Sequence, residues 1–332
     1  MDIYNTFIST KTQISINNYL ENSTNKENIN EILKGLFAEH KYISSKYFYD
    51  KAGSKLFEEI THLPEYYPTL TEKAILRNLA PQIAKTLENV DIIELGSGDC
   101  SKISILLEAV PPENLGSIRY IPVDVSHSAI LKSSKMLIEK FPDITINGLV
   151  ADFLNHLNLI PNDANRLFCF FGSTLGNLTR KQSVGFLLDL KKCMRHGDQL
   201  LLGLDMVKDT AVVENAYNDK QGITAAFNKN ILNVINRIAH TDLEAESFEH
   251  MAFYNECECR IEMHLKALKK IEVYCPDSDK NIIFKKWETI HTENSHKYTE
   301  SYILNFAALS GLTINNIYSD ANKWFSVVHF IY

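Results

Sequence analysis

The stretch ELGSGDCSK combines two glycines and a lysine in a pattern that can hold a nucleotide-like cofactor. Gly96 and Gly98 follow a short apolar run that predicts a strand, and Lys102 falls in the first turn of the helix expected next. Glycine lets the backbone approach a ligand closely, because it has no side chain and accepts unusual dihedral angles. Such glycines also simply end strands, so the interpretation depends on the residues that accompany them.

Acidic and aromatic residues follow the next two predicted strands. Asp124 ends the strand in RYIPVDVS, where a carboxylate can bind ribose hydroxyls. Asp152 and Phe153, in ADF, end the following strand and offer adenine a hydrogen-bond acceptor and an aromatic face. A dinucleotide fingerprint has a third glycine where this chain has Ser101, so the set favours S-adenosyl-L-methionine over NAD. Two structural alternatives stay open, namely Asp152 as a helix cap and Phe153 as a core residue.

The stretch FFGSTLGNLT places Gly172, Ser173 and Asn177 after another predicted strand. A nucleophilic serine is not expected, because the pattern is not G-x-S-x-G and no His/Asp arrangement accompanies it. Gly172 can bring backbone close to a transferred methyl group, and Asn177 can hydrogen-bond a small polar substrate. An ordinary strand-to-helix turn with asparagine as a cap explains the stretch equally well.

Two adjacent tyrosines lie between prolines in LPEYYPTLTE. Pro68 disfavours a helical conformation at Tyr67, so we expect an extended segment there. Neighbouring side chains of an extended segment point to opposite sides. Only one of Tyr66 and Tyr67 can therefore face a ligand.

These residues need a scaffold of alternating strands and helices. Apolar strands alternate with helices between Asp91 and Met206, which predicts a parallel sheet covered on both faces. The final runs TINNIYSD and WFSVVHFIY are too close for a helical crossover and should pair as an antiparallel hairpin. The predicted fold class is α/β, a Rossmann-like methyltransferase sheet ending in that hairpin, plus a smaller α+β domain. A helix is expected over residues 28–43, after a loosely packed lead of about thirty residues.

Length and charge limit the remaining possibilities. The chain has 332 residues, enough for about two domains, and a net charge of -7 without a basic stripe. We therefore expect no nucleic-acid or membrane partner, and a monomer that acts on a small molecule. The amino terminus does not resemble a signal peptide and no apolar run reaches membrane-spanning length, which predicts a cytoplasmic protein with reduced cysteines. No metal site is expected, since no His/Cys cluster has ligand spacing.

The chain closely resembles the histidine Nα-methyltransferase family of ergothioneine biosynthesis. The stretches that carry the resemblance are KYFYDKAGSKLFEEITHLPEYYPTLTEKAIL, ELGSGDCSK, IPVDV, FFGSTLGNLT, LLLGLDMVKD, AYNDKQGITAAFNKNIL and RIEMHL. The resemblance implies trimethylation of the α-amino group of L-histidine by S-adenosyl-L-methionine, giving hercynine. It also implies a methyltransferase domain over residues 71–208, completed by 297–332, and a substrate domain made of a helical part, 1–70, and an insertion, 209–296.

The resemblance implies roles for individual residues. Tyr49 and Gly172 are the expected catalytic positions, with Tyr49 able to accept a proton through water. The methyl donor is expected at Gly96, Lys102, Asp124, Asp152 and Phe153. The amino acid is expected at Phe57, Tyr66, Asn177, Tyr217, Thr224, Met263, Glu293 and Ser295.

Within this set, Asn177 and Tyr217 would bind the substrate carboxylate, and Glu293 and Ser295 the two imidazole nitrogens. The rings of Tyr49, Phe57 and Tyr66 would face the quaternary ammonium of the product.

Other functions remain open. Relatives of this fold methylate tryptophan or its derivatives, but a buried unpaired carboxylate at Glu293 would disfavour an indole, and Met263 also matches the histidine enzymes. A protein that binds a small molecule on this fold without catalysis is a further alternative. A dehydrogenase is opposed by the missing third glycine and by the closing hairpin.

Overall fold

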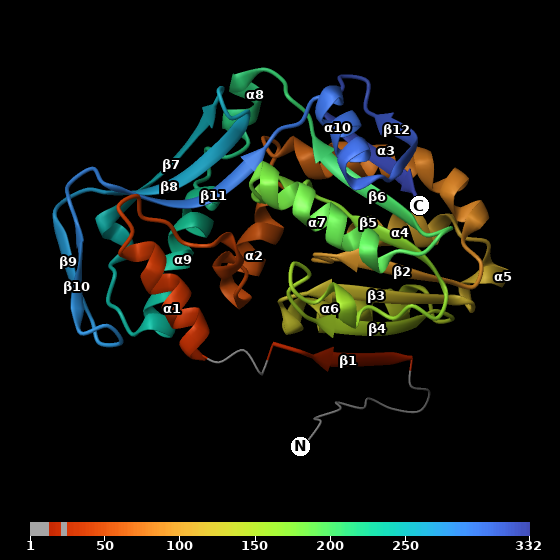
Figure 1. Ribbon diagram of the computed structural model, residues 1–332, viewed down its shortest axis with the longest axis horizontal. Coiled ribbons are helices and arrows are strands. Elements are labelled where there is room, and N and C mark those ends of the chain that lie inside the picture. The colour runs from red at the N-terminus through yellow and green to blue at the C-terminus, as the bar shows by residue number, and fades with distance from the viewer. Residues whose placement is uncertain (1–12, 21–24) are drawn as a thin grey trace. The chain divides into compact units, whose positions relative to one another are not determined.

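The computed structural model describes residues 13–20 and 25–332, which form two compact units (Figure 1). Among these residues the first unit contains 13–20, 68–207 and 297–332, and the second contains 25–67 and 208–296. Within the two described ranges, no helix combines the length and apolar character needed to cross a bilayer.

An eight-stranded sheet forms the centre of the first unit, counted over the described residues. Six strands run parallel, in the order β1 (Ile14–Asn18), β4 (Thr145–Val150), β3 (Ile118–Asp124), β2 (Val90–Leu95), β5 (Asn165–Phe170) and β6 (Gln199–Asp205). The sheet ends with β13 (Phe325–Ile331) and β12 (Thr313–Ser319), which pair antiparallel. The predicted parallel sheet with a closing hairpin is confirmed.

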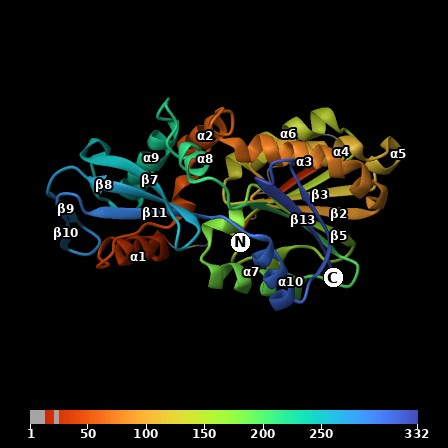
Figure 2. The same cartoon turned by 90° about the horizontal axis from the view of Figure 1, so that it is seen from above.

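Helices cover both faces of this sheet. One face packs against α3 (Tyr67–Ile83), α4 (Ser101–Ala109) and α6 (His127–Lys140), and the other against α7 (Arg180–Cys193) and α10 (Glu300–Ser310) (Figure 2). Consecutive strand residues alternate between the two cores, as Ile92 and Ile93 do. The central strands are mostly apolar for this reason. Shorter elements are η2 (Ala84–Thr86), α5 (Pro112–Leu115), η3 (Leu157–Leu159) and η4 (Thr174–Asn177).

The strand β1 was not expected. The sequence predicts a loose lead for the first thirty residues and a helical part of the substrate domain over 1–70, but Ile14–Asn18 pair in parallel with β4. The Ser15 hydroxyl donates to the Asn147 side chain at 3.1 Å, which fixes the register. Residues 1–12 and 21–24 lie outside the described residues. The substrate-binding role of 1–70 and 209–296 stays a prediction.

The second unit combines helices with two small antiparallel sheets. Its helices are α1 (Asn25–Leu36), η1 (Ser45–Phe48), α2 (Lys51–Ile60), α8 (Thr210–Asn215), α9 (Ile223–Ala239) and η5 (Ala245–Ser247). One sheet has the order β11 (Thr289–His296), β8 (Arg260–Ala267), β7 (Phe248–Asn255), and the other pairs β10 (Lys280–Phe284) with β9 (Ile271–Cys275). The helix expected over 28–43 ends at Leu36, because the chain returns so closely that a Cβ on Gly35 would lie 2.2 Å from the Tyr42 carbonyl oxygen.

The helices α2 and α9 are tied together by Asp50. Its carboxylate caps α2 by accepting from the Gly53 backbone N–H at 2.8 Å, and it also accepts from Asn230 and Arg237 of α9, each at 2.9 Å. A Cβ on Gly53 would lie 1.7 Å from the Phe48 carbonyl oxygen, so only glycine fits there. This junction sets where the aromatic side chains of α2 meet α9.

Candidate functional site

The glycine loop after β2 lies at the carboxyl edge of the parallel sheet. Gly96 and Gly98 have φ angles of +69° and +52°, a region that favours glycine. A Cβ on Gly98 would meet no atom within 4 Å, so the backbone is open on that side. β2 lies between β3 and β5, at the point of the sheet where the strand order reverses. Ligands of open α/β sheets bind at such a point.

Asp124 is held against this loop. Its carboxylate accepts from the backbone N–H of Gly98 at 3.2 Å and of Ser126 at 2.9 Å. Burial raises the pKa of Asp124, while these N–H groups favour its charged form. The residue is thus a fixed acceptor beside the loop, as a ribose-binding carboxylate must be.

Asp152 holds a turn rather than capping a helix, and Phe153 is a partly buried residue at the edge of the core. The Asp152 carboxylate accepts from the Leu154 backbone N–H at 2.9 Å and from the Asn155 side chain at 2.7 Å. The Phe153 ring packs edge-on, 5.2 Å from Phe170 between ring centroids. A Cβ on Gly96 would lie 3.8 Å from the Phe153 ring, so this ring also borders the glycine loop.

Glu72 joins two of the predicted site residues and was missed by the sequence analysis. Its fully buried carboxylate lies 2.7 Å from the Lys102 ammonium and accepts from the Gly172 backbone N–H at 3.0 and 2.9 Å. A Cβ on Gly203 would lie 2.0 Å from Glu72 Oε1, so the carboxylate also requires glycine on β6. The available signal was a charge at a core position of α3, three residues before the buried Ile75.

The turn from Gly172 to Asn177 follows β5. Gly172 and Ser173 have φ angles of +75° and +56°. The buried Ser173 hydroxyl accepts from the Asp205 backbone N–H at 2.9 Å, which is a structural role rather than that of a nucleophile. Asn177 is half-buried at the last position of η4. Asp205 also forms a buried ion pair with Lys297 at 2.8 Å.

Glu94, at the end of β2, is buried behind the glycine loop. The Tyr120 hydroxyl donates to its carboxylate at 2.5 Å. Burial raises the pKa of Glu94 to about 8. Because the neutral acid is favoured, Glu94 acts as part of the core, not as a charged ligand.

In the second unit, four predicted residues form a continuous chain of aromatic contacts. Between ring centroids, Tyr49 lies 5.8 Å from Phe57, Phe57 lies 6.4 Å from Tyr66, and Tyr66 lies 6.3 Å from Tyr217. Each of these pairs packs edge to face. Phe227 of α9, which the sequence analysis did not single out, lies 5.9 Å from Phe57. Residues from four separate segments therefore present ring faces and edges to one another.

The two adjacent tyrosines have separate partners, but the extended conformation predicted at Tyr67 is wrong. Tyr67 is the first residue of α3, and Pro68 occupies the first turn, where its missing N–H costs no helical bond. The Tyr67 hydroxyl accepts from Lys208 at 2.8 Å, and the same ammonium lies 4.4 Å from the ring centroid. Tyr66 is the member that contacts Phe57 and Tyr217.

A β-bulge in β11 determines which of its side chains lie on the same face of the three-stranded sheet as Met263. His291 pairs with His264 of β8, but the register shifts before Glu293, which pairs with Met263. Paired residues share a face and consecutive residues do not, so the shift turns His291 and Glu293 to opposite faces. Met263, Glu293 and Ser295 are therefore on one face, all buried.

Hydrogen bonds connect that face to the aromatic chain and to α9. The Tyr217 hydroxyl donates to the Ser295 hydroxyl at 2.7 Å. Asn228 of α9, also missed by the sequence analysis, accepts from the Thr292 hydroxyl at 2.7 Å and so fixes the bulge. Thr224 is buried near the start of α9, and its backbone N–H donates to Asp219 at 2.8 Å.

The structure thus places the predicted residues in two groups. The first unit carries Gly96, Lys102, Asp124, Asp152, Phe153, Gly172 and Asn177, and the second carries Tyr49, Phe57, Tyr66, Tyr217, Thr224, Met263, Glu293 and Ser295. Their roles toward a ligand stay predictions.

Known proteins resemble the chain over most of its length. Residues 28–331 match the family model described as histidine-specific methyltransferase, SAM-dependent. The chain is 39% identical over 308 residues to the histidine N-alpha-methyltransferase of Mycolicibacterium smegmatis, covering 92% of this chain and 96% of that protein. It is 40% identical over 283 residues to the protein of the same name in Mycobacterium tuberculosis, covering 85% and 88%. Ergothioneine biosynthesis protein 1 of Neurospora crassa is 35% identical over 196 residues, 57% of this chain and 22% of that protein.

Proposed function

Because the chain belongs to the family of histidine-specific, S-adenosyl-L-methionine-dependent methyltransferases, we propose that it trimethylates the α-amino group of L-histidine. The product is hercynine, and the reaction is the first step of ergothioneine biosynthesis. The observation that carries this proposal is the buried face of Met263, Glu293 and Ser295, which the Tyr217 hydroxyl connects to the aromatic chain.

The first unit supplies the residues for the methyl donor. The glycine loop has open space beside Gly98, and Asp124 stands beside it as a fixed acceptor for ribose hydroxyls. Phe153 borders Gly96 and would offer an aromatic contact to the adenine, and Asp152 follows β4 at the same edge of the sheet. S-adenosyl-L-methionine supplies an electrophilic methyl group on a sulfonium. Lys102, held by the Glu72 carboxylate, completes the set that would hold this donor, and Gly172, held by the same carboxylate, is assigned to the transferred methyl group.

The second unit supplies the residues for histidine. A neutral imidazole has one N–H donor and one acceptor nitrogen, and the carboxylate of Glu293 with the hydroxyl of Ser295 matches both. Tyr217 is assigned to the substrate carboxylate. Because Tyr217 already donates to Ser295, the groups for the carboxylate and for the ring belong to one hydrogen-bonded set.

Each of the three methyl transfers requires a neutral amine. The site must also accommodate the permanent cation that the last transfer produces. The protein's contribution is to orient the amine toward the methyl group, which can be worth about 7 to 11 kcal/mol in favourable systems. Tyr49 is assigned to receive the released proton through water. The rings of Tyr49, Phe57 and Tyr66 suit a quaternary ammonium, which has no N–H left to donate, at roughly 0.5 to 2 kcal/mol per contact.

Methylation of tryptophan is the second candidate, and Glu293 speaks against it. The buried side chains of Glu293 and Ser295 can match both nitrogens of an imidazole, whereas an indole has one N–H donor and no acceptor nitrogen, so it would match only one of the two.

Mass spectrometry of the product tests the proposal directly. With S-adenosyl-L-methionine, L-histidine should gain three methyl groups, and L-tryptophan should gain none at matched concentrations. Calorimetry with S-adenosylhomocysteine and NAD supplies the control, because only the former should bind. Binding of NAD alone, or methylation of tryptophan in preference to histidine, would overturn the assignment.

A further inference from the structure

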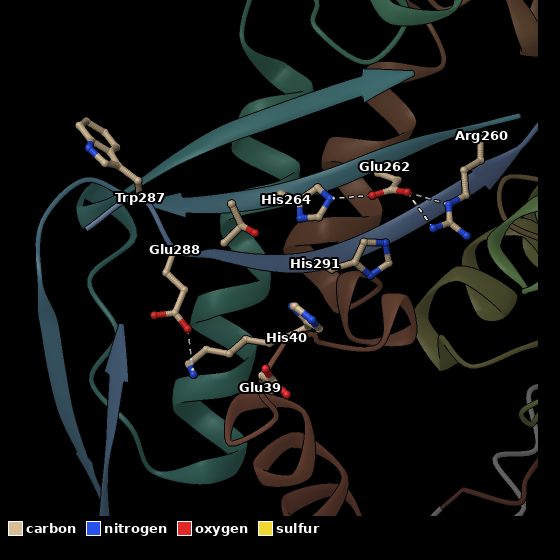
Figure 3. Close-up of a pocket in the computed structure, with 10 residues that line it drawn as sticks. Glu39, His40, Arg260, Glu262, His264, Trp287, Glu288 and His291 are labelled. Atoms are coloured by element: carbon tan, nitrogen blue, oxygen red, sulfur yellow. Dashed lines mark hydrogen bonds and ion pairs between the residues drawn. The ribbon is translucent and has the colours of Figure 1, made fainter. Parts of the chain in front are cut away.

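The outer face of the three-stranded sheet in the second unit carries a cluster that the proposed function does not use. A pocket of about 540 Å³ lies there, and Glu262, His264 and His291 line it together with Arg260 (Figure 3). These residues are on the face of the sheet opposite to Met263 and Glu293, because of the alternation along β8 and the bulge in β11.

The backbone register brings the three side chains together. Glu262 and His264 are two residues apart on β8 and share a face, and His291 is the direct partner of His264 on β11. One possible ligand atom from each of the three residues lies within 4.8 Å of the other two. Local spacing along the chain shows only Glu-x-His, so the third member could not be found from the sequence.

We propose that Glu262, His264 and His291 form a binding site for one divalent transition-metal ion of the Zn²⁺ type. Two imidazoles and one carboxylate are a common ligand set for such ions, and three protein ligands leave a coordination position for water or a small anion. The pocket over the cluster provides the space for that fourth ligand.

Neighbouring hydrogen bonds orient the three side chains. Glu262 Oε1 accepts from Arg260 at 2.7 Å and from Asn255 at 2.9 Å, which leaves Oε2 directed toward His264 Nε2 at 3.1 Å. On β11, His291 Nε2 lies 2.9 Å from the side-chain oxygen of Asn294. Partners of this kind fix ligand orientation in known metal sites.

One buried nitrogen supplies an independent reason to expect a ligand. His264 Nδ1 has no hydrogen-bond partner among the residues that the structure describes. A buried polar atom in that state calls for a partner, and an ion or the water that it binds would provide one. If the cluster were held together only by the hydrogen bonds given above, His264 Nδ1 would stay buried without a partner.

The test must separate this cluster from the cysteines nearby. Cys257 and Cys259 lie in the turn between β7 and β8, and thiolates also bind Zn²⁺. We therefore choose the full-length double variant Cys257→Ser/Cys259→Ser as the starting protein. After treatment with a chelator, titration calorimetry with Zn²⁺ should show one ion bound per chain.

Two further substitutions assign the site. In that background, His291→Gln and His264→Gln should each weaken Zn²⁺ binding by more than about 10-fold, since even a group that only orients a ligand is worth roughly 10- to 100-fold. His196→Gln, at an exposed position of the first unit, should leave the affinity unchanged. Circular dichroism establishes that each variant is folded.

Cobalt provides a readout that needs no histidine variant. Co²⁺ bound to the Cys257→Ser/Cys259→Ser protein should give d–d absorption without a thiolate charge-transfer band, and Zn²⁺ should displace it. Absence of binding in this background, or equal affinity of folded His291→Gln, would overturn the proposal. None of these measurements uses methyl transfer, so the result is independent of the proposed function.

Discussion

The carboxylate of Glu72 accepts the backbone N–H of Gly172, with its two oxygens at 3.0 and 2.9 Å. The same carboxylate lies 2.7 Å from the Lys102 ammonium. One buried side chain of α3 thereby sets the position of two residues, Gly172 from the turn after β5 and Lys102 from α4, that we assign to the donor and its transferred methyl group. We infer that Glu72 is a positioning residue for the donor.

Glu72→Gln should weaken S-adenosylhomocysteine binding and lower the free energy of unfolding by about 3 kcal/mol, because Lys102 is left as a largely buried charge without its partner. Calorimetry and urea unfolding measure the two effects. Glu88→Gln, an exposed position in the same unit, is the control for loss of one charge and should change neither.

A second variant tests the origin of the stability loss. In Glu72→Gln/Lys102→Met the unpaired charge is gone, so most of the stability should return. Cofactor affinity equal to that of the natural protein in Glu72→Gln would contradict the inference.

Glu293→Gln should reduce kcat/KM for histidine by roughly 10- to 100-fold, the usual effect of losing a hydrogen bond to a charged group. S-adenosylhomocysteine affinity should be unchanged. Asn294→Ala is the matched control, because Asn294 pairs with Glu262 and is on the opposite face of the sheet. Equal histidine kinetics in Glu293→Gln would show that this carboxylate does not recognise the ring.

Phe57→Leu should slow the last methyl transfer more than the first, because only the trimethylated product carries a permanent cation beside the rings. The loss of one ring face is expected to cost roughly 0.5 to 2 kcal/mol. Quantitative mass spectrometry should then detect accumulated dimethylhistidine. Phe37→Leu, at a largely exposed position of the same unit, should give the natural product ratio.

Gly53→Ala should strongly destabilise the second unit, since its Cβ would lie 1.7 Å from the Phe48 carbonyl oxygen, which cannot move independently of the chain. Gly185→Ala is the contrasting variant within α7, where a Cβ meets no atom within 4 Å. That change should raise stability by about 0.5 to 1 kcal/mol. Thermal melts that shift in the same direction for both variants would refute the steric argument.

Glu94 should make stability depend on pH. Its pKa is raised by burial from an ordinary 4.5 to about 8, so the folded state binds the extra proton between these values. The stabilisation is complete below about pH 4.5 and is lost as pH rises through 8. Relative to Glu94→Gln, the ligand-free protein should therefore lose up to a few kcal/mol between pH 5 and 8, at no more than about 1.4 kcal/mol per pH unit.

Urea unfolding of the two proteins at both pH values measures this difference. Glu113→Gln, which changes an exposed glutamate of the same unit, is the control and should show the stability of the natural protein at each pH. A constant difference between Glu94→Gln and the natural protein would show that Glu94 is ionised throughout.

The sheet of the first unit was predictable because its strands are buried on both faces. Mostly apolar runs such as VDIIEL and RLFCFF mark such strands, and the short interval between the last two strands of the chain forces a hairpin. The strand β1 carries no such signal. Its residues are only half-buried and its identity comes from pairing with β4, far away in the sequence.

The candidate site was harder to predict where a face depends on register. In TIHTENSH, a regular strand would place His291 and Glu293 on the same face, because they are two residues apart. The bulge, fixed by Thr292 and Asn228, separates them. Glu72 posed a different problem, since its partners come from the turn after β5 and from α4, and only the tertiary fold brings them together.

The second unit is assembled from two segments, and this constrains its folding during synthesis. Residues of α2 leave the ribosome long before those of α9, so Phe57 has no ring partner in α9 until Phe227 has been made. The intervening chain supplies most of the large sheet, whose own strand β13 arrives last of all. Since both units need carboxyl-terminal residues, neither can be completed on a nascent chain that ends before them. Chains truncated before Phe325 lack β13, so their large sheet is incomplete and they should be recognised by the cell's proteases as unfolded.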